Sequence, residues 1–100
     1  MCAFGITFLP TDGHSLFNKE SYELLNYNNP INIGNNVWIC YSATFLKGAS
    51  IPNNCVVGAN AVVNKSFIED SVLIAGNPSK VIRKNIIWER KSPSQSYNIF

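Results

Sequence analysis

The sequence predicts an all-β fold, a parallel β-helix, on the strength of a six-residue repeat and of two apolar positions within it. The repeat runs through residues 33–67, and the first position of every hexad is large and apolar. These first positions are Ile33, Ile39, Phe45, Ile51, Val57 and Val63. The fifth position is mostly small, and it holds Val37, Ala43, Ala49, Cys55, Ala61 and, as the exception, Phe67. An α-helix repeats near 3.6 residues and a strand near 2, so neither alone produces this period.

Each hexad is expected to form one short strand and one corner, so that three hexads close a triangular coil. The first side chain of each hexad then fills the interior, and the fifth lies inside near a corner, where there is little room. Self-similarity at a fixed period is the sequence signature of a solenoid. The N-terminus already follows the repeat, since Cys2 and Phe8 are six residues apart and Ile6 takes a fifth position. No polar cap precedes it, so we expect a fragment of a longer protein or a separate cover at that end.

A loop insertion interrupts the repeat over residues 11–31. Thr-Asp-Gly-His at 11–14 and the asparagine-rich cluster at 26–29 have the residue types of tight turns. The residues between them are polar with scattered leucine and phenylalanine. Long ordered loops in compact domains are uncommon and usually functional, so this loop is the expected place for a site.

The end of the chain predicts a closure of the solenoid. Residues 71–75 read as one more strand, and Gly-Asn-Pro-Ser at 76–79 stops the regular coil. Residues 81–91 are expected to form a final strand running into a short amphipathic helix that covers the C-terminal end of the solenoid. The predicted domain therefore spans residues 1–90, with a loose C-terminal tail at 91–100.

Composition bounds the possible functions. One hundred residues predict one small domain, and 46% apolar with 14% charged residues predicts a globular chain. The net charge of +2 argues against nucleic acid as the main partner. No apolar run reaches the length of a membrane span, and no signal peptide is visible. The three cysteines lack metal-site spacing, so no metal is expected, and they predict a reducing cytoplasmic location.

Several motifs together resemble the hexapeptide-repeat acyltransferases. They are the hexads, Thr-Asp-Gly-His-Ser at 11–15, the stretches 33–39 and 57–63, and Ala-Gly-Asn-Pro-Ser-Lys-Val-Ile-Arg at 75–83. The most similar branch is the bacterial O-acetyltransferases that modify sugars of surface polysaccharides, and galactoside, maltose and serine acetyltransferases are also similar. The resemblance implies a left-handed parallel β-helix, a homotrimer with active sites between neighbouring subunits, and acetyl-CoA as donor. Family members have further coils before the point where this chain begins, so N-terminal coils are expected to be missing.

Acetyl transfer to a hydroxyl requires a base that removes the hydroxyl proton during attack on the thioester. Histidine suits this role because an imidazole titrates near neutral pH, and His14 is the only histidine. The family motif assigns His14 as the general base, and a solvent-exposed loop histidine is the alternative. Asp12 could orient the imidazole or contact the acceptor, or it could simply form the turn.

The resemblance also places the donor. By position, the residues that correspond to CoA-contacting places are Trp38, Tyr41, Ala59, Asn64, Lys65, Lys80 and Arg83. Trp38 takes an outward sixth position, where its ring could pack on CoA or form a trimer contact. The cations Lys65, Lys80 and Arg83 could meet the CoA phosphates, and solvated surface charge is the alternative for each.

Two classes of function remain open from the sequence. The first is an acetyl-CoA-dependent O-acetyltransferase that acts on a sugar hydroxyl, with serine or another small hydroxyl compound as the alternative acceptor. The second is a catalytically silent trimeric solenoid. A trimer is expected because apolar side chains take outward positions that a monomer would expose to solvent. The outward residues in question are Trp38, Tyr41, Val56, Val62 and Ile68.

Overall fold

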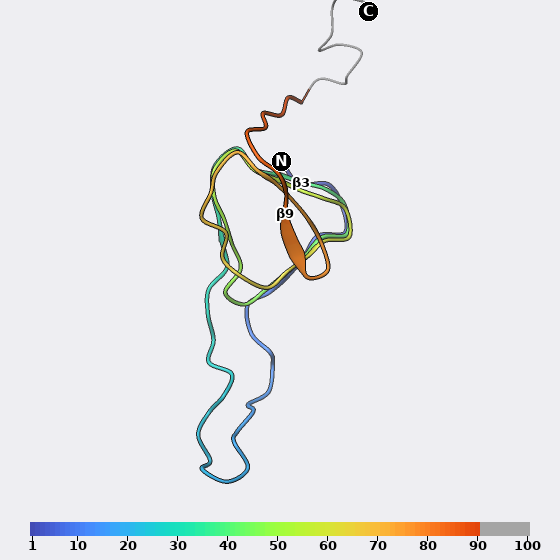
Figure 1. Cartoon of the computed structure of the whole chain (residues 1–100). Coiled ribbons are helices and arrows are strands. Elements are labelled where there is room, and N and C mark those ends of the chain that lie inside the picture. Colours follow the sequence, from blue (N-terminus) through green and yellow to red (C-terminus); the bar gives the residue numbers. More distant parts are fainter. Residues whose placement is uncertain (91–100) are drawn as a thin grey trace, which may run out of the picture.

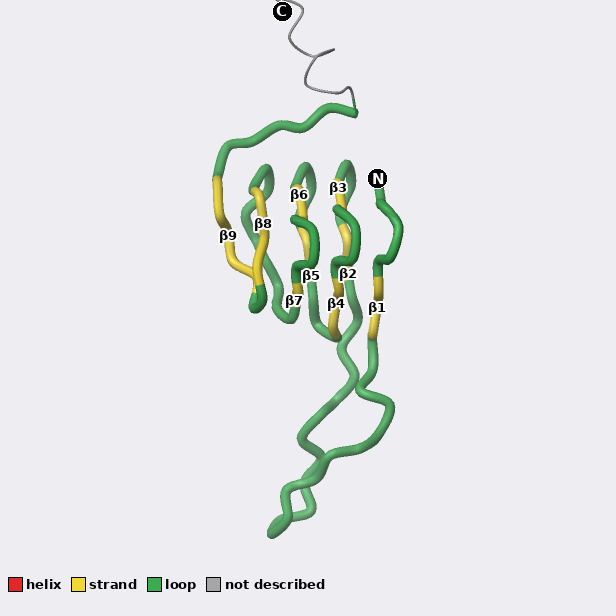
Figure 2. The backbone as a smooth tube through the Cα atoms, turned by 90° about the vertical axis from the view of Figure 1, so that its right-hand side faces the viewer, coloured by secondary structure: helices red, strands yellow, loops and turns green. Residues whose placement is uncertain are grey.

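The computed structural model describes residues 1–90, in which short strands wind into a stack of coils and one long arm projects from the stack (Figure 1). Seen from the side, the N-terminus lies at one end of the stack and β9 at the other (Figure 2). The strands of this part of the chain are β1 (Thr7–Leu9), β2 (Asn32–Ile33), β3 (Trp38–Ile39), β4 (Thr44–Leu46), β5 (Ser50–Ile51), β6 (Val56–Val57), β7 (Val62–Val63), β8 (Leu73–Gly76) and β9 (Ser79–Arg83).

The strands form three sheets, in the orders β1-β4-β7, β2-β5 and β3-β6-β8-β9. Every pair is parallel except the terminal hairpin of β8 and β9. Trp38 pairs with Val56 and Thr44 with Val62, so a coil contains 18 residues, which is three hexads. The predicted all-β fold with parallel strands is confirmed. The left-handed sense of the coil stays a prediction.

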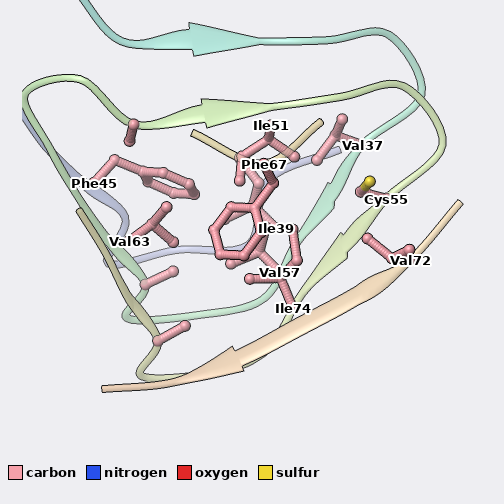
Figure 3. Close-up of a cluster of buried hydrophobic side chains, with 13 residues drawn as sticks. Val37, Ile39, Phe45, Ile51, Cys55, Val57, Val63, Phe67, Val72 and Ile74 are labelled. Atoms are coloured by element: carbon pink, nitrogen blue, oxygen red, sulfur yellow. The ribbon is translucent and has the colours of Figure 1, made fainter. Parts of the chain in front are cut away.

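The interior is filled by the two apolar positions of the repeat (Figure 3). Every first position from Ile39 to Val63 is buried, and Ile33 is half-buried against the same cluster. Every fifth position from Val37 to Phe67 is buried as well. Small side chains occupy most fifth positions because they point inward beside a corner, where neighbouring strands approach one another. The predicted hexad register is therefore confirmed.

The corners share a third regularity of the repeat, which is a positive φ at the fourth position of the hexad. The residues that show it are Gly5, Asn36, Ser42, Gly48, Asn54 and Asn60, and the exception is Ser66 in the last hexad. The left-handed conformation disfavours side chains with a Cβ, yet glycine adopts it freely and asparagine tolerates it. Gly34 is required for a different reason, because a Cβ there would lie 2.5 Å from Oδ1 of Asn53.

The first nine residues already belong to the coil stack. Cys2 bridges to Ile39, and β1 pairs in register with β4, so that Phe8 lies opposite Phe45. The rings of Phe8 and Phe45 stack with centroids 5.1 Å apart. The prediction that the repeat is under way at the first residues is confirmed. Both Cys2 and Phe8 are exposed, because they lie in the outermost coil of this end.

The predicted C-terminal helix is wrong for the residues that the structure describes. The expected final strand is present as β9, but residues 84–90 form no helix and run as an irregular segment along the stack (Figure 2). Seven residues are too few for a helix to be stable alone, and tertiary contacts hold this segment instead. The backbone N–H of Ile86 donates to the carbonyl of Ser71, and the ring of Trp88 lies 6.0 Å from that of Trp38. The tail at 91–100 lies outside the described residues.

The arm occupies the interval between β1 and β2, and both of its ends are anchored on one corner of the next coil. Leu9 pairs with Leu46, Asn32 pairs with Ser50, and the backbone N–H of Gly48 donates to the carbonyl of Asn29. Thr7 pairs with Thr44, a spacing of 37 residues, whereas the coil from Thr44 to Val62 uses 18 and the coil from Val56 to Leu73 uses 17. The insertion therefore leaves the coil register intact. The described part of the chain contains no helix with the length and apolar character needed to cross a bilayer.

Candidate active site

His14 lies on the outgoing limb of the arm and faces a depression of about 370 Å³ between the two limbs. The lining residues are Thr11, Gly13, His14, Ser15, Leu24, Asn26, Tyr27 and Asn28. Gly13 has a φ of +85°, and its N–H donates to Oγ1 of Thr11 at 3.3 Å, which forms the tight turn before the histidine. The His14 side chain is exposed, and no other described residue hydrogen-bonds to its imidazole. Both ring nitrogens are thus open to a partner from outside the chain.

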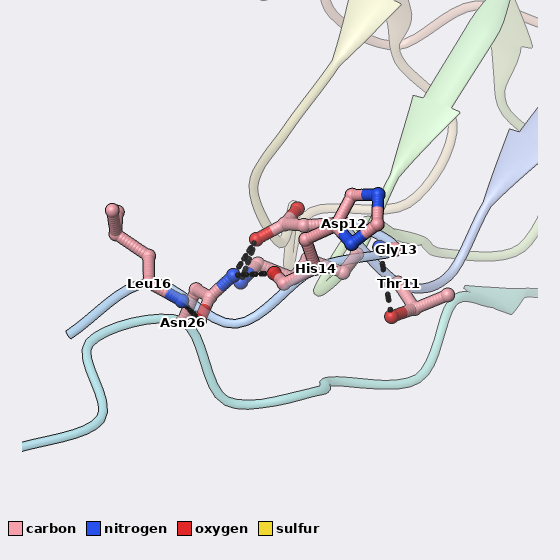
Figure 4. Close-up of polar contacts among 7 residues, drawn as sticks. Thr11, Asp12, Gly13, His14, Leu16 and Asn26 are labelled. Atoms are coloured by element: carbon pink, nitrogen blue, oxygen red, sulfur yellow. Dashed lines mark hydrogen bonds and ion pairs between the residues drawn. The ribbon is translucent and has the colours of Figure 1, made fainter.

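Asn26, on the returning limb, joins the two limbs of the arm through one side chain (Figure 4). Its Nδ2 donates to Oδ2 of Asp12 at 2.9 Å and to the carbonyl oxygen of His14 at 2.8 Å. Its Oδ1 accepts from the N–H of Leu16 at 2.7 Å. The segment that carries His14 is therefore bound on both sides to a residue ten or more positions away in sequence.

Asp12 is paired with a cation of the coil rather than with the imidazole. Nζ of Lys47 lies 2.8 Å from Oδ2 of Asp12, and the Lys47 side chain is 24% exposed where it leaves the corner after β4. The hydrogen bond from Lys47 and then the one from Asn26 lower the pKa of Asp12. Desolvation opposes them, and the coulombic attraction of Lys47 makes the smallest contribution. Asp12 is therefore ionised and engaged by two donors.

Sequence reasoning missed both Asn26 and Lys47. Asn26 was part of a cluster that predicts turns, and its side-chain role depends on the two limbs lying side by side. The sequence did contain a hint for Lys47, because it takes the third hexad position, as does the predicted CoA contact Lys65 one coil later. Nothing local in the sequence indicates that this corner meets Asp12, which is 35 residues earlier.

The structure brings two of the predicted donor-site residues together. Lys65 and Lys80 line a depression of about 290 Å³ together with Ser66, Phe67, Ile68, Glu69 and Val81, and the Glu69 carboxylate pairs with Lys84. Nζ of Lys65 lies 5.2 Å from the centroid of the Phe67 ring. Asn64 directly precedes Lys65 on the same corner and is exposed. Two cations beside an apolar floor can bind an anionic group that is attached to an apolar body.

The remaining predicted donor residues lie elsewhere on the coil. Tyr41 and Ala59 are exposed at equivalent positions of consecutive coils, and the Tyr41 ring stacks on Phe4 with centroids 6.0 Å apart. Arg83 ends β9 opposite Leu73 and does not line the depression between Lys65 and Lys80. Trp38 is half-buried, because its ring packs against Trp88. The outward position of Trp38 is thus partly covered by its own chain.

Comparison with known proteins decides the family. No protein-family model matches the chain. The putative acetyltransferase YJL218W of Saccharomyces cerevisiae is 39% identical over 87 residues, which cover 87% of this chain and 43% of that protein. The solved structure of the polysialic acid O-acetyltransferase OatWY is 43% identical, with a TM-score of 0.87 over 91% of this chain and 44% of its own. The chain belongs to the hexapeptide-repeat acetyltransferase family.

A further structural relative is galactoside acetyltransferase, solved in complex with coenzyme A. It is 35% identical, with a TM-score of 0.64 over 80% of this chain and 39% of its own. This hexapeptide-repeat chain spans less than half the length of the relatives it matches. The prediction of family membership from the hexads and the 11–15 and 75–83 motifs is confirmed.

Proposed function

We propose that this chain carries the active-site coils of an acetyl-CoA-dependent O-acetyltransferase that acts on a sugar hydroxyl, with His14 as the general base. The observation that supports this most strongly is the setting of the single histidine. Its imidazole faces a depression lined largely by polar side chains, and its backbone is fixed by Asn26. Relatives named for polysialic acid and galactoside acetylation support a sugar as the acceptor class.

The proposed reaction is a direct acyl transfer. The acceptor hydroxyl oxygen attacks the thioester carbonyl carbon of acetyl-CoA, while its proton passes to a neutral His14 nitrogen. The carbon–sulfur bond then breaks, and the proton leaves the imidazole to the departing CoA sulfur. The products are the acetyl ester and CoA with a free thiol. Neither ring nitrogen is hydrogen-bonded to another described residue, so the nitrogen that carries no hydrogen in the neutral ring can accept the proton.

The proposed donor site lies on the same edge of the solenoid as the base of the arm. Lys65 lies one coil above Lys47, the residue that holds Asp12. We assign the CoA phosphates to Lys65 and Lys80, which share one depression. The remaining proposed contacts with CoA are those of Trp38, Tyr41, Ala59, Asn64 and Arg83. The solved complex of galactoside acetyltransferase with coenzyme A supports CoA as the donor carrier.

We also propose a left-handed coil that assembles as a homotrimer, with each active site between neighbouring subunits. Exposed apolar side chains support assembly, since Ile68 is 95% exposed and Phe17 and Leu25, on the arm, are each 53% exposed. Three of the outward residues contribute less than the sequence indicated, because Val56 is buried and Trp38 and Val62 are half-buried within the chain. Light scattering that gives only the monomer mass at micromolar concentration would contradict the trimer.

A thiol-release assay tests the function. The protein is mixed with acetyl-CoA and a panel of acceptors that includes sialic acid polymers, galactosides, maltose and serine, and free CoA thiol is measured over time. Release that depends on a sugar supports the proposal, and release with serine alone supports the small-hydroxyl alternative. If no acceptor produces release while CoA still binds, the silent solenoid describes this chain better.

The free cysteines Cys2, Cys40 and Cys55 fit the proposed cytoplasmic location.

A further inference from the structure

We propose that Asn26 and Lys47 are positioning residues for His14, acting together with Asp12, which links them. The inference deepens the proposed function and rests on it, because it concerns the placement of the assigned base. Neither residue hydrogen-bonds to the imidazole, since Asn26 reaches the His14 carbonyl and Lys47 reaches Asp12. Their role is to hold the His14 backbone at a fixed place relative to the coil that carries the donor site.

We call the connected side chains of Asp12, Asn26 and Lys47 the brace. Its first part is the Asn26 side chain, whose hydrogen-bonding capacity is almost fully used. Its amide nitrogen serves Asp12 and the His14 carbonyl, and its amide oxygen serves the Leu16 N–H. These three partners lie before, at and after the histidine. Only a side-chain amide carries two N–H donors and an acceptor oxygen on one planar group. Asp lacks the donors and Leu has no polar atom, so neither can replace Asn26.

The second part connects this fork to the coil. Lys47 projects from the corner between β4 and β5, and its Nζ reaches the same Asp12 oxygen that accepts from Asn26. The other links from the arm to the coil lie at its two ends, near Leu9 and Asn29. Without the ion pair, the His14 segment would be free to swing about those ends.

The cost of losing the brace is expected in the chemical step. An exposed ion pair contributes little stability, so the fold should survive its removal. A displacement of about 1 Å at a reacting group, however, lowers turnover by roughly two orders of magnitude. Because the donor contacts are assigned to other residues, the KM for acetyl-CoA should be unaffected.

The first measurement needs no activity. Backbone amide relaxation of the full chain reports the order of Gly13, His14 and Ser15, and the single histidine gives one assignable imidazole signal. Asn26→Leu and Lys47→Met should lower the heteronuclear NOE of these amides. Asn18→Ala is the matched control, because the Asn18 side chain accepts from the N–H groups of Glu20 and Ser21 at the far end of the same arm. That control should loosen the tip and leave the His14 amide unchanged.

The second measurement is steady-state kinetics on the same variants. Asn26→Leu and Lys47→Met should each lower kcat by roughly 10- to 100-fold with unchanged KM for acetyl-CoA. Lys47→Arg should restore most of the rate, since a guanidinium can still pair with Asp12. The double variant should be little worse than the poorer single variant, because both act through one carboxylate.

The outcomes separate this inference from the proposed function. If the wild type transfers acetyl groups and both variants keep its kcat, the positioning role is overturned although the function stands. If the His14 amide stays as ordered in both variants as in the wild type, the brace itself is overturned. If the wild type transfers to no acceptor, the proposed function fails, and the positioning role fails with it whatever the relaxation data show.

Discussion

The indole N–H of Trp88 donates a hydrogen bond to the backbone carbonyl of Asn36 at 2.9 Å, across 52 residues of sequence. Asn36 is a corner residue with positive φ, directly before Val37 and β3. Together with the contact between the Trp88 and Trp38 rings, this bond fastens residues 84–90 to the second coil. Trp88 therefore adds a second attachment to the one made by the Ile86 N–H, which donates to the carbonyl of Ser71.

Replacing Trp88 tests this attachment. Trp88→Phe keeps a ring against Trp38 but removes the donor, so it should lower the free energy of unfolding by about 0.5–1.5 kcal/mol. Ile87→Ala is the control, since Ile87 is 89% exposed and should change stability by no more than about 0.5 kcal/mol. Urea denaturation followed by circular dichroism measures both. Equal midpoints for Trp88→Phe and the wild type would show that the bond contributes nothing.

A second prediction concerns the small side chains that point inward at the fifth hexad positions. Ala49 is fully buried at a fifth hexad position, so Ala49→Leu should overpack the coil and cost about 1–3 kcal/mol. Ala59→Leu adds the same atoms at an exposed corner and should be close to neutral. Thermal unfolding of the two variants compares them directly. A melting midpoint for Ala49→Leu equal to that of the wild type would contradict the hexad register.

The pKa of Asp12 should respond to Lys47. The hydrogen bond from Lys47 is the largest cause that lowers this pKa below 3.8, so Lys47→Met should raise it toward that value. Because the pKa is depressed, the contact is complete above pH 3.8 and is lost as the pH falls through the lowered value. An NMR titration of the carboxyl carbon measures the change, with Lys19→Met at the arm tip as the control. An identical titration in Lys47→Met and wild type would exclude the ion pair in solution.

His14→Ala should lower turnover by roughly 10²–10⁴-fold, since the chain has no second histidine to accept the hydroxyl proton. CoA binding should change little. Kinetics and calorimetric CoA titration measure the two effects separately, with Lys19→Ala as a control at the arm tip. Wild-type turnover in His14→Ala would refute the base assignment.

Lys65 and Lys80 should contribute to the affinity for CoA through its phosphates. Lys65→Met and Lys80→Met should each weaken CoA binding roughly tenfold, which is about 1.4 kcal/mol. Binding of pantetheine, which lacks the phosphates, should not change. Lys19→Met, which removes a lysine far from the depression, is the matched control. Equal losses for CoA and pantetheine would mean that the lysines support the fold of this edge and do not bind phosphate.

Sequence periodicity was sufficient for the interior of the solenoid, because position in the hexad alone decides whether a side chain points inward. The same periodicity carried a corner signal, the asparagines Asn36, Asn54 and Asn60, that the apolar pattern did not include. The prediction of a helix near Trp88 was wrong because apolar spacing over a few residues cannot distinguish a helix from an irregular segment that long-range hydrogen bonds and a ring contact hold in place.

The candidate site likewise contains residues that the sequence predicts and residues whose role depends on non-local contacts. His14 could be found from its motif, and Lys65 and Lys80 from their places near the end of the repeat. Asn26 and Lys47 could not, because their partners are set by how the arm folds back and where its base meets the coil. The approach of Lys47 to Asp12 is non-local, and hexad position does not encode it.

Because the coil register is the same on both sides of the arm, the corner between β4 and β5 can accept inserted segments of different length. Leu9 and Asn32 rest over Leu46 and Ser50, only four residues apart, whatever chain runs between them. Closing a longer loop costs little entropy, about 0.6 kcal/mol for each doubling of its length. One coil scaffold can therefore exchange this segment for another of different length and chemistry. Under the proposed function, acceptor choice can then diversify while the proposed donor-binding edge stays unchanged.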